Sequence, residues 1–214
     1  MGAKTWMLVI ADTNAREALA RKPTLDRDAT RTMAGTLFPD DKLTPLGDGD
    51  LSRTCPPKNE VYVGCFPGVT VIAAKEIGID CPSKLHPRFL KAAGDRAVTL
   101  HAMHSVVDWF AYAIWEHGKL VRSLSVSPDS GIMEDIGQRL AFEEPYWSGK
   151  HPVGVDEDAD AYPLPFHPLE LGEAALMDRF GYQLEGDIVA TLLEPATIPL
   201  VRFQRTRSAW WKFW

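Results

Sequence analysis

The stretch that decides the fold is Val106–Trp115, VVDWFAYAIW, followed by Glu116-His117-Gly118 and by Lys119–Val126, KLVRSLSV. Both runs alternate at period two, and a tight connection that contains glycine joins them, so the sequence predicts a β-hairpin. In the first run, one face carries Val107, Trp109, Ala111, Ala113 and Trp115, and the other carries Val106, Asp108, Phe110, Tyr112 and Ile114. Both faces are mainly apolar, which predicts a central strand that is covered on both sides.

Further strands are predicted on both sides of this hairpin. Residues 5–11 form a nearly continuous apolar run, which is typical of a strand buried on both faces. Residues 60–66 and 69–74 predict a second hairpin, because Pro67 presets the first turn dihedral and Gly68 tolerates a positive φ. Residues 97–104 and 188–203 predict two more strands. Residues 43–59, rich in Pro and Gly, are expected to be mostly loop, with one short strand at 42–46.

Helices are expected to pack on the sheet. Helical spacing and capping residues predict them at 15–19, 25–38, 87–92, 133–140 and 169–180, the last one closed by Gly181. The predicted fold class is therefore α+β: a single domain with a mostly antiparallel β-sheet and helices packed on it, plus a basic aromatic C-terminal tail. We assign the α+β domain to residues 1–186 and the C-terminal strand and tail to residues 187–214.

The composition is that of an ordinary globular protein with an acidic balance. The chain has 214 residues, 45% of them hydrophobic, and a formal net charge of -6 at pH 7. An acidic body disfavours nucleic acid as a partner, because phosphate contacts come from a net-basic surface. Cysteines are sparse, apolar runs are too short to span a membrane, and no secretory signal is evident, so we expect a cytoplasmic protein. Phosphate-loop and dinucleotide motifs are absent, so no cofactor is expected.

Two histidines form the densest polar constellation. His101 and His104 lie in the predicted strand 97–104, with Asp108 just beyond it. Imidazoles with carboxylates suit a metal such as Zn²⁺, and a histidine paired with Cys65 would suit a nucleophilic hydrolase. On a strand, however, positions three apart point to opposite faces, so the two histidines are expected to serve different surfaces. We therefore expect no metal site and keep His101, His104, Cys65 and Asp108 as catalytic candidates for an alternative function.

Polar and aromatic residues after the hairpin form a candidate binding surface. Alternation places Ser123, Ser125 and Ser127 on one face, where their hydroxyls would either line a polar groove or face solvent. Residues 127–161 contain nine Asp or Glu residues and only two cations, Arg139 and Lys150. The candidate binding residues on this surface are Arg122, Ser123, Ser125, Asp129, Glu143, Glu144, Tyr146 and Trp147.

The C-terminal residues 202–214 are basic and aromatic. They contain four cationic residues and no acidic one, which leaves 19 cationic against 29 acidic residues in the rest of the chain. Trp210, Trp211 and Trp214 among these cations would suit a membrane interface, single-stranded nucleic acid or an acidic partner groove. We favour a tail that folds back over its own acidic body, because three exposed Trp side chains would lower solubility. Membrane-surface contact is not favoured.

Four stretches resemble an uncharacterised actinobacterial family of the domain-of-unknown-function kind. They are MGAKTWMLV at the start, VYVGCFPG at 61–68, the run from LHAMHS to EEPYW at 100–147, and the run from YPLPFHP to YQLEG at 162–186. The resemblance implies a bacterial protein but assigns no activity. The hairpin is also similar to a segment of bacterial immunity-type proteins, which bind partners rather than turn over substrate.

These features predict a non-catalytic cytosolic module for binding or protein interaction. Its partner, an unknown protein or a small ligand, is expected to meet the hairpin and the acidic residues 127–147. The alternative is a small metal- or Cys/His-dependent hydrolase centred on His101 and His104.

Overall fold

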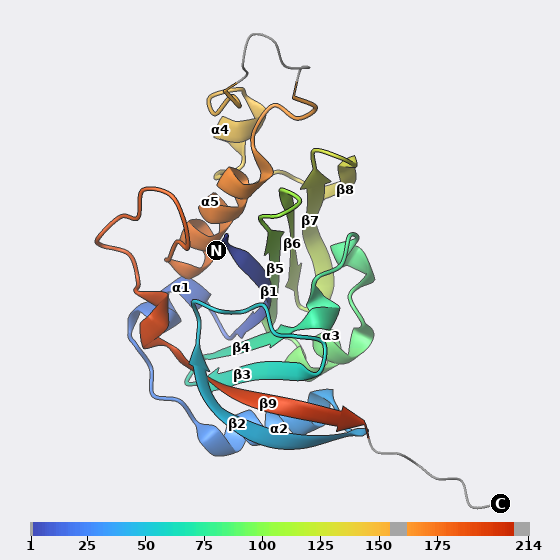
Figure 1. Cartoon of the computed structure of the whole chain (residues 1–214), viewed down its shortest axis with the longest axis vertical. Helices are drawn as coiled ribbons and strands as arrows, with labels where there is room; N and C mark the ends of the chain where they lie inside the picture. Colours follow the sequence, from blue (N-terminus) through green and yellow to red (C-terminus); the bar gives the residue numbers. More distant parts are fainter. Residues whose placement is uncertain (1, 155–161, 208–214) are drawn as a thin grey trace, which may run out of the picture.

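A computed structural model describes residues 2–154 and 162–207, and within them nine strands form one antiparallel sheet. Its order is β2-β9-β3-β4-β1-β5-β6-β7-β8, and Figure 1 shows that β5 to β8 cross the direction of β2, β9, β3 and β4, so the sheet is strongly twisted. The strands are β1 (Lys4–Ala11), β2 (Asp41–Asp50), β3 (Glu60–Phe66), β4 (Val69–Ala74), β5 (Ala97–His104), β6 (Trp109–Glu116), β7 (Lys119–Ser127), β8 (Gly131–Gly137) and β9 (Pro199–Arg207).

Helices cover both faces of this sheet. One face carries α1 (Ala15–Ala20), α4 (Glu144–Trp147) and α5 (Pro168–Phe180), and the other carries α2 (Arg27–Leu37) and α3 (Pro87–Ala93). Three short 3-10 helices complete the described elements: η1 (Lys75–Ile77), η2 (Pro82–Lys84) and η3 (Pro195–Thr197). The predicted α+β class, with a mostly antiparallel sheet and packed helices, is confirmed.

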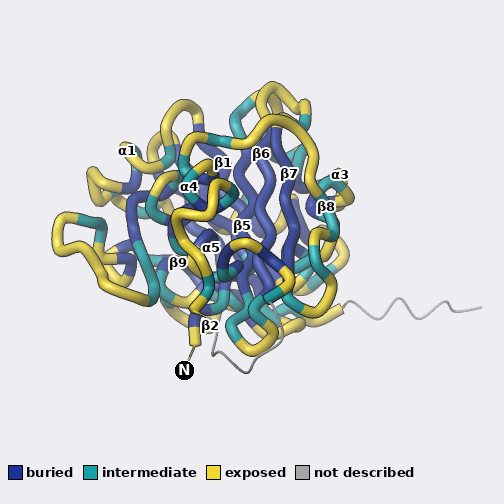
Figure 2. Tube along the Cα trace, turned by 90° about the horizontal axis from the view of Figure 1, so that it is seen from above, coloured by how far each residue is buried: buried dark blue, intermediate teal, exposed yellow. Residues whose placement is uncertain are grey.

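The hairpin β6–β7 lies where the sheet is covered on both sides, as its alternation predicts. Trp109, Ala111, Ala113 and Trp115 join the core under α2 and α3, whereas Phe110, Tyr112 and Ile114 join the core under α5. Figure 2 shows β5, β6 and β7 buried along most of their length. His117 and Gly118 adopt positive φ angles of 49° and 72° in the connecting turn, which is where glycine is favoured.

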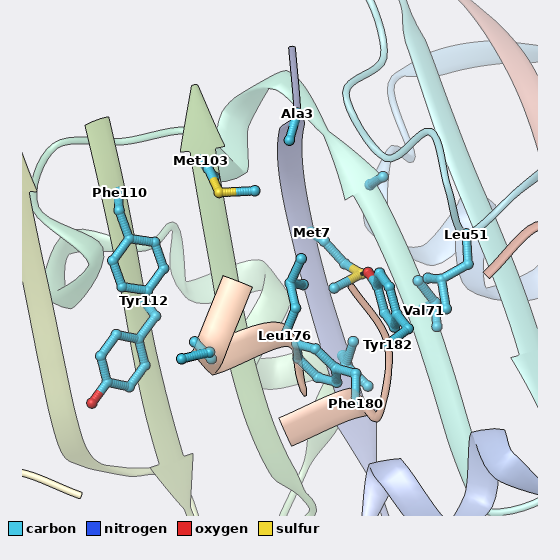
Figure 3. Packing of buried hydrophobic residues seen from close by; sticks show 14 of the residues in the cluster. Ala3, Met7, Leu51, Val71, Met103, Phe110, Tyr112, Leu176, Phe180 and Tyr182 are labelled. Carbon is cyan, nitrogen blue, oxygen red and sulfur yellow. The ribbon is translucent and has the colours of Figure 1, made fainter. Parts of the chain in front are cut away.

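Large apolar side chains fill the core between the sheet and α5. Met7 of β1 and Val71 of β4 face Leu176 and Phe180 of α5, and the Tyr182 hydroxyl lies 3.6 Å from the Met7 sulfur (Figure 3). All five are buried, and each fully buried large side chain contributes about 1.5–3 kcal/mol of transfer free energy. This packing fixes α5 over β1, β5 and β6.

Local turn and cap signals are also confirmed. The hairpin β3–β4 turns at Pro67-Gly68, and Gly68 has a φ of 76°. Asn14 caps α1, Asp26 caps α2, and Gly181 ends α5 in the left-handed conformation with a φ of 80°.

The predicted helix at 133–140 is wrong, because residues 131–137 form the edge strand β8. Two successive side chains of β8 are used on opposite faces of the sheet: Glu134 accepts from Ser123, and Asp135 pairs with Arg122. That alternation requires a strand.

The predicted loop at 43–59 is also corrected at its start. Its first part belongs to β2, which is ten residues long and pairs with β9 at the edge of the sheet. An edge position tolerates Pro45, and the pairing shifts register between Pro45 and Gly47. The strand predicted from Val106 begins instead at Trp109, after a turn.

The last strand begins later than predicted and lies inside the sheet. Residues 188–198 lead through η3 to β9, which pairs with β2 on one side and β3 on the other. Among the helices of the described residues, none is long and apolar enough to cross a membrane. The predicted tail cluster of Trp210, Trp211 and Trp214 lies outside the described residues.

Candidate binding site

His101 is a packing residue in the core. Its Nδ1 accepts a hydrogen bond from the Thr5 hydroxyl at 2.7 Å, and its Nε2 donates to the Gly172 carbonyl at 3.0 Å. We assign this tautomer because a carbonyl oxygen can only accept. Burial lowers the pKa of His101 from 6.5 to about 4, so the ring is neutral at pH 7. The residue joins β1, β5 and α5, and no ligand can reach it without opening that core.

His104 faces the opposite side of the sheet, as the strand spacing predicts. It stacks on Trp6 with ring centroids 6.5 Å apart, whereas His101 packs against Phe110 and Phe180 on the other face. The two imidazoles are therefore not brought together. Among the described residues, no group of three or more His, Cys, Asp or Glu side chains is arranged to hold a metal ion.

Cys65 and Asp108 are not brought to either histidine. Cys65 lies on β3, which is separated from β5 by β4 and β1, so about 14 Å of sheet lies between the two strands. Burial raises the pKa of the Cys65 thiol, which disfavours the thiolate. Asp108 has a positive φ of 45° and lies beside His167, with 3.7 Å between Oδ2 and Nε2. The pairings expected for the alternative hydrolase are thus absent from the described residues.

Arg122 is the centre of a buried ionic network rather than a surface group. Its side chain and that of Glu143 are both fully buried, with Nη2 and Oε2 2.7 Å apart. Arg122 also donates to Asp135, and Glu143 accepts from the Tyr112 hydroxyl and the Leu140 amide. Burial opposes the guanidinium charge, but the hydrogen bonds with Glu143 and Asp135 outweigh it and raise the pKa of Arg122. This network fastens the chain after β8 to the sheet.

The row of serines, Ser123, Ser125 and Ser127, is also buried. It therefore neither faces solvent nor lines one continuous open groove. Ser123 and Ser125 are buried beneath η2: Ser123 donates to Glu134, and Ser125 accepts from the Trp109 indole at 3.1 Å. Ser83 of η2 donates to the same Glu134 carboxylate. Only Ser127, at the end of the row, reaches a cavity.

The aromatic residues of α4 pack inward. Tyr146 is buried and its hydroxyl donates to the Glu170 carbonyl at 3.2 Å. Trp147 packs edge-on against Phe166, and the Arg139 guanidinium lies 3.9 Å from its ring centroid. Of the predicted binding residues in 143–147, Glu144 is the one whose side chain is exposed.

A cavity of about 300 Å³ lies on the face of the sheet that carries α2 and α3, at the end where β5 meets β6. We call it the Trp6 cavity. It lies between the β5–β6 turn, the β7–β8 turn and the segment after η1, which are far apart in the sequence. Its lining residues are Trp6, Lys75, Gly78, Asp80, His104, Val107, Trp109, Ser127, Asp129, Ser130 and Met133. Asp129 and His104, two of the candidate site residues predicted from the sequence, line it, and so does Ser127 from the predicted row of serines.

Trp6 is held rigidly in the wall of this cavity. A Cβ placed on Gly78 would lie 2.4 Å from Trp6 Cδ1, so the indole packs directly on the Gly78 backbone. The Lys75 ammonium lies 3.7 Å from the centroid of the Trp6 ring, within the range of a cation–π interaction. Trp109 is held in turn by its hydrogen bond to Ser125. The aromatic walls are therefore preorganised.

The polar groups of the Trp6 cavity favour a positive charge. Asp80 and Asp129 are exposed and form no ion pair with any described residue. Burial, and then the charges of Lys4 and Lys75, lower the pKa of His104, so its ring is neutral at pH 7. Its Nδ1 is buried without a hydrogen-bond partner among the described residues. The carboxylates thus outnumber the single ammonium of Lys75.

Exposed valines stand beside the opening. Val106 is 73% exposed and Val107 is 48% exposed, although both are apolar. Sequence reasoning missed Trp6, Lys75, Gly78 and Asp80 because they are remote in the chain from the predicted surface. No local pattern marks them. The pairing of β1 with β5 brings Trp6 to this surface, and the pairing of β4 with β1 brings the segment that follows β4.

One comparison with known proteins gives a match. A family model described as "Family of unknown function (DUF6928)" matches residues 5–203. No curated protein and no solved structure matches the chain. The matched range runs from β1 into β9 and includes every residue that lines the Trp6 cavity.

Proposed function

We propose that this chain, which belongs to the family of unknown function DUF6928, is a non-catalytic protein-interaction domain that receives a cationic side chain of a partner. The cationic side chain would enter the Trp6 cavity. This cavity lies at the edge of the binding surface that the sequence predicts, which consists of the hairpin β6–β7 and residues 127–147. The three cysteines of the chain are free thiols, which is typical of a protein in a reducing compartment. We therefore further propose that the protein works in the cytoplasm.

The observation that carries the proposal is the position of the Lys75 ammonium. It lies 3.7 Å from the centroid of the Trp6 ring, so the cavity wall already holds one cationic group of the chain itself. The electron-rich face of an indole attracts cations, and this attraction strengthens where water is excluded. A partner lysine or arginine would use the same attraction by taking the place of the Lys75 ammonium on this ring.

Two further features support a cation as the bound group. The Asp80 and Asp129 carboxylates line the cavity and have no ion-pair partner among the described residues. The lowered pKa of His104 removes the one imidazole charge that would repel a cation at pH 7. Carboxylates placed around an apolar cavity select for opposite charge as well as for shape.

The exposed valines favour a partner protein over a free amine. Val106 and Val107 extend the apolar surface beyond the cavity opening, where a small ion would leave them uncovered. A peptide whose cationic side chain enters the cavity would cover them with its flanking residues. An apolar contact around a buried polar anchor is the usual anatomy of a protein interface.

The test is a nuclear magnetic resonance titration of the labelled protein with three tripeptides, each acetylated at the N-terminus and amidated at the C-terminus: Gly-Lys-Gly, Gly-Arg-Gly and Gly-Gln-Gly, which is then uncharged. The indole N–H signals of Trp6 and Trp109, assigned with W6F and W109F, report on the cavity walls. We expect the two cationic peptides to shift both signals and Gly-Gln-Gly to leave them unchanged.

Matched variants tie the effect to the cavity. D80N and D129N should each weaken the binding of the two cationic peptides. D95N should leave that binding unchanged, because Asp95 is exposed at the opposite end of β5. Equal shifts with Gly-Gln-Gly would show that peptides bind in the cavity but would overturn the proposed preference for a positive charge. An absence of shifts with all three peptides would overturn the proposal as a whole.

A further inference from the structure

A second cavity, separate from the Trp6 cavity, gathers cationic side chains from three parts of the chain. It has a volume of about 670 Å³ and lies where α2 ends, β2 begins and β9 ends. We call it the Arg205 cavity. It is lined by Phe38, Pro39, Asp40, Asp41, Lys58, Asn59, Arg88, Arg205 and Arg207.

Two of its guanidinium groups are held on one aromatic ring. The Cζ atom of Arg205 lies 3.9 Å from the centroid of the Phe38 ring, and that of Arg88 lies 4.6 Å from the same point. Phe38 is 2% exposed, so the ring is a fixed platform. Two like charges this close repel each other, and the Glu76 carboxylate that bonds both of them offsets that repulsion.

Carboxylates satisfy part of these guanidiniums and orient them. Arg205 Nε donates to Asp41 at 2.8 Å, and Arg205 Nη1 donates to Glu76 at 2.7 Å. Arg88 Nη2 donates to the same Glu76 oxygen at 3.4 Å. The side chains therefore need little further ordering to bind a ligand, which lowers the entropy cost of binding.

Donors remain after these bonds are counted. Arg88 Nε is buried with no hydrogen-bond partner among the described residues, and Arg205 Nη2 forms no hydrogen bond to a described residue. Lys58 and Arg207 line the same cavity with exposed side chains. Three carboxylates lie near these cations. Asp41 and Glu76 are already bonded to Arg205, and Asp40 lines the cavity with an exposed side chain.

We propose that the Arg205 cavity binds the phosphate group of a small phosphorylated molecule. Planar guanidiniums with N–H donors left over match the oxygens of a phosphate, and the shared platform lets two of them donate to one phosphate group. The cavity is larger than a phosphate ion needs, so the remaining volume is available to the group that carries the phosphate. The local excess of cations stands out against the acidic body of the chain.

Isothermal titration calorimetry of the full chain tests this assignment with inorganic phosphate, glycerol 3-phosphate and glycerol. We expect both phosphates to bind, the ester more tightly, and glycerol not to bind. Equal affinity for the two phosphates would show that the free ion is the ligand and would overturn the proposal of a phosphate ester. If neither phosphate bound, the proposal that the Arg205 cavity binds a phosphate group would be overturned.

Charge variants locate the binding. R207Q and R88Q should each lower the affinity for glycerol 3-phosphate by about tenfold. R31Q should leave this affinity unchanged, because Arg31 is an exposed residue of α2 outside the cavity. If R88Q fails to fold by circular dichroism, R88K replaces it, because the lysine keeps the charge but loses bidentate binding. Equal loss in R31Q would mean general charge attraction and would overturn the proposal.

Discussion

His101 makes the folded state sensitive to acid. Its pKa is about 4 in the fold against 6.5 for an ordinary histidine, because burial disfavours the charged ring. The unfolded chain therefore binds more protons between pH 4 and 6.5. The stability that the neutral ring contributes is fully present above pH 6.5 and is lost as the pH falls toward 4.

We predict that H101Q loses less stability on acidification than the wild type. Gln keeps one donor for the Gly172 carbonyl and one acceptor for the Thr5 hydroxyl but does not titrate. The loss of unfolding free energy between pH 7 and pH 4 should be smaller in H101Q by about 3 kcal/mol. Urea unfolding at pH 7, 6, 5 and 4 measures it. The same loss in both proteins would contradict the assignment.

Glu173 acts with the opposite sign and provides the control. Burial raises the pKa of its carboxyl from 4.5 to about 7, so its contribution is present at acidic pH and is lost as the pH rises through 7. Between pH 4.5 and 6.5 it partly masks the effect of His101. E173Q should therefore show a steeper acid-side loss than the wild type, and H101Q/E173Q a shallower one than E173Q.

The elements β7, β8 and α4 are joined by the two ion pairs of Arg122, with Asp135 and with Glu143. Replacing Arg122 by methionine leaves the Glu143 carboxylate buried without its charge partner, so we predict that R122M costs about 3–5 kcal/mol of unfolding free energy. R122M/E143Q should cost less than R122M, because a neutral amide still accepts from the Leu140 amide. Chemical denaturation of the single and double variants measures this order.

R139M is the matched control for that series. Arg139 lies 3.9 Å from Asp135 with its side chain 41% exposed, so its loss should cost less than about 1 kcal/mol. If the double variant proved no more stable than R122M, the cost would lie in lost packing and hydrogen bonds rather than in the unpaired charge.

The fit of the η1 segment against β1 shapes the Trp6 cavity. We predict that G78A destabilises the fold by about 1–3 kcal/mol, because the new Cβ would lie 2.4 Å from Trp6 Cδ1 and must displace the indole. The Trp6 indole signal should move, and Gly-Lys-Gly should bind more weakly. G35A is the control: its Cβ would meet nothing within 4 Å in helix α2, so it should stabilise the fold. An unmoved Trp6 signal in G78A would contradict the packing.

Elements whose signals are local could be predicted, and those set by partners could not. The two apolar faces of β6 and the turn at Pro67-Gly68 depend on a few neighbouring residues, so the sequence is enough to predict them. Strand β8 was missed because its polar side chains are explained only by partners on β7, such as Arg122 for Asp135. The Trp6 cavity was missed for the same reason, since Asp129 was predicted as a binding residue but Trp6 and Lys75 come from other elements.

Across the whole molecule, η1 connects the two cavities. Lys75 lies on Trp6 in one, and its neighbour Glu76 bonds Arg205 and Arg88 beside the other. Neighbouring residues of η1 thus contact both sites, although the proposed ligands have opposite charge.

The position of β9 decides how far the chain can be shortened. Because β9 pairs with both β2 and β3, it closes a gap in the sheet that residues 1–186 cannot close by themselves. We predict that the 1–186 fragment does not unfold cooperatively and self-associates, since it would leave β2 without its partner and the edge of β3 open. The 1–207 fragment keeps every described strand, so we expect it to unfold cooperatively as a monomer. Circular dichroism melting and size-exclusion chromatography compare the three lengths. A cooperative, monomeric 1–186 fragment would show that β9 is an addition to a complete domain, and a large loss of stability in the 1–207 fragment would show that residues 208–214 pack on the body.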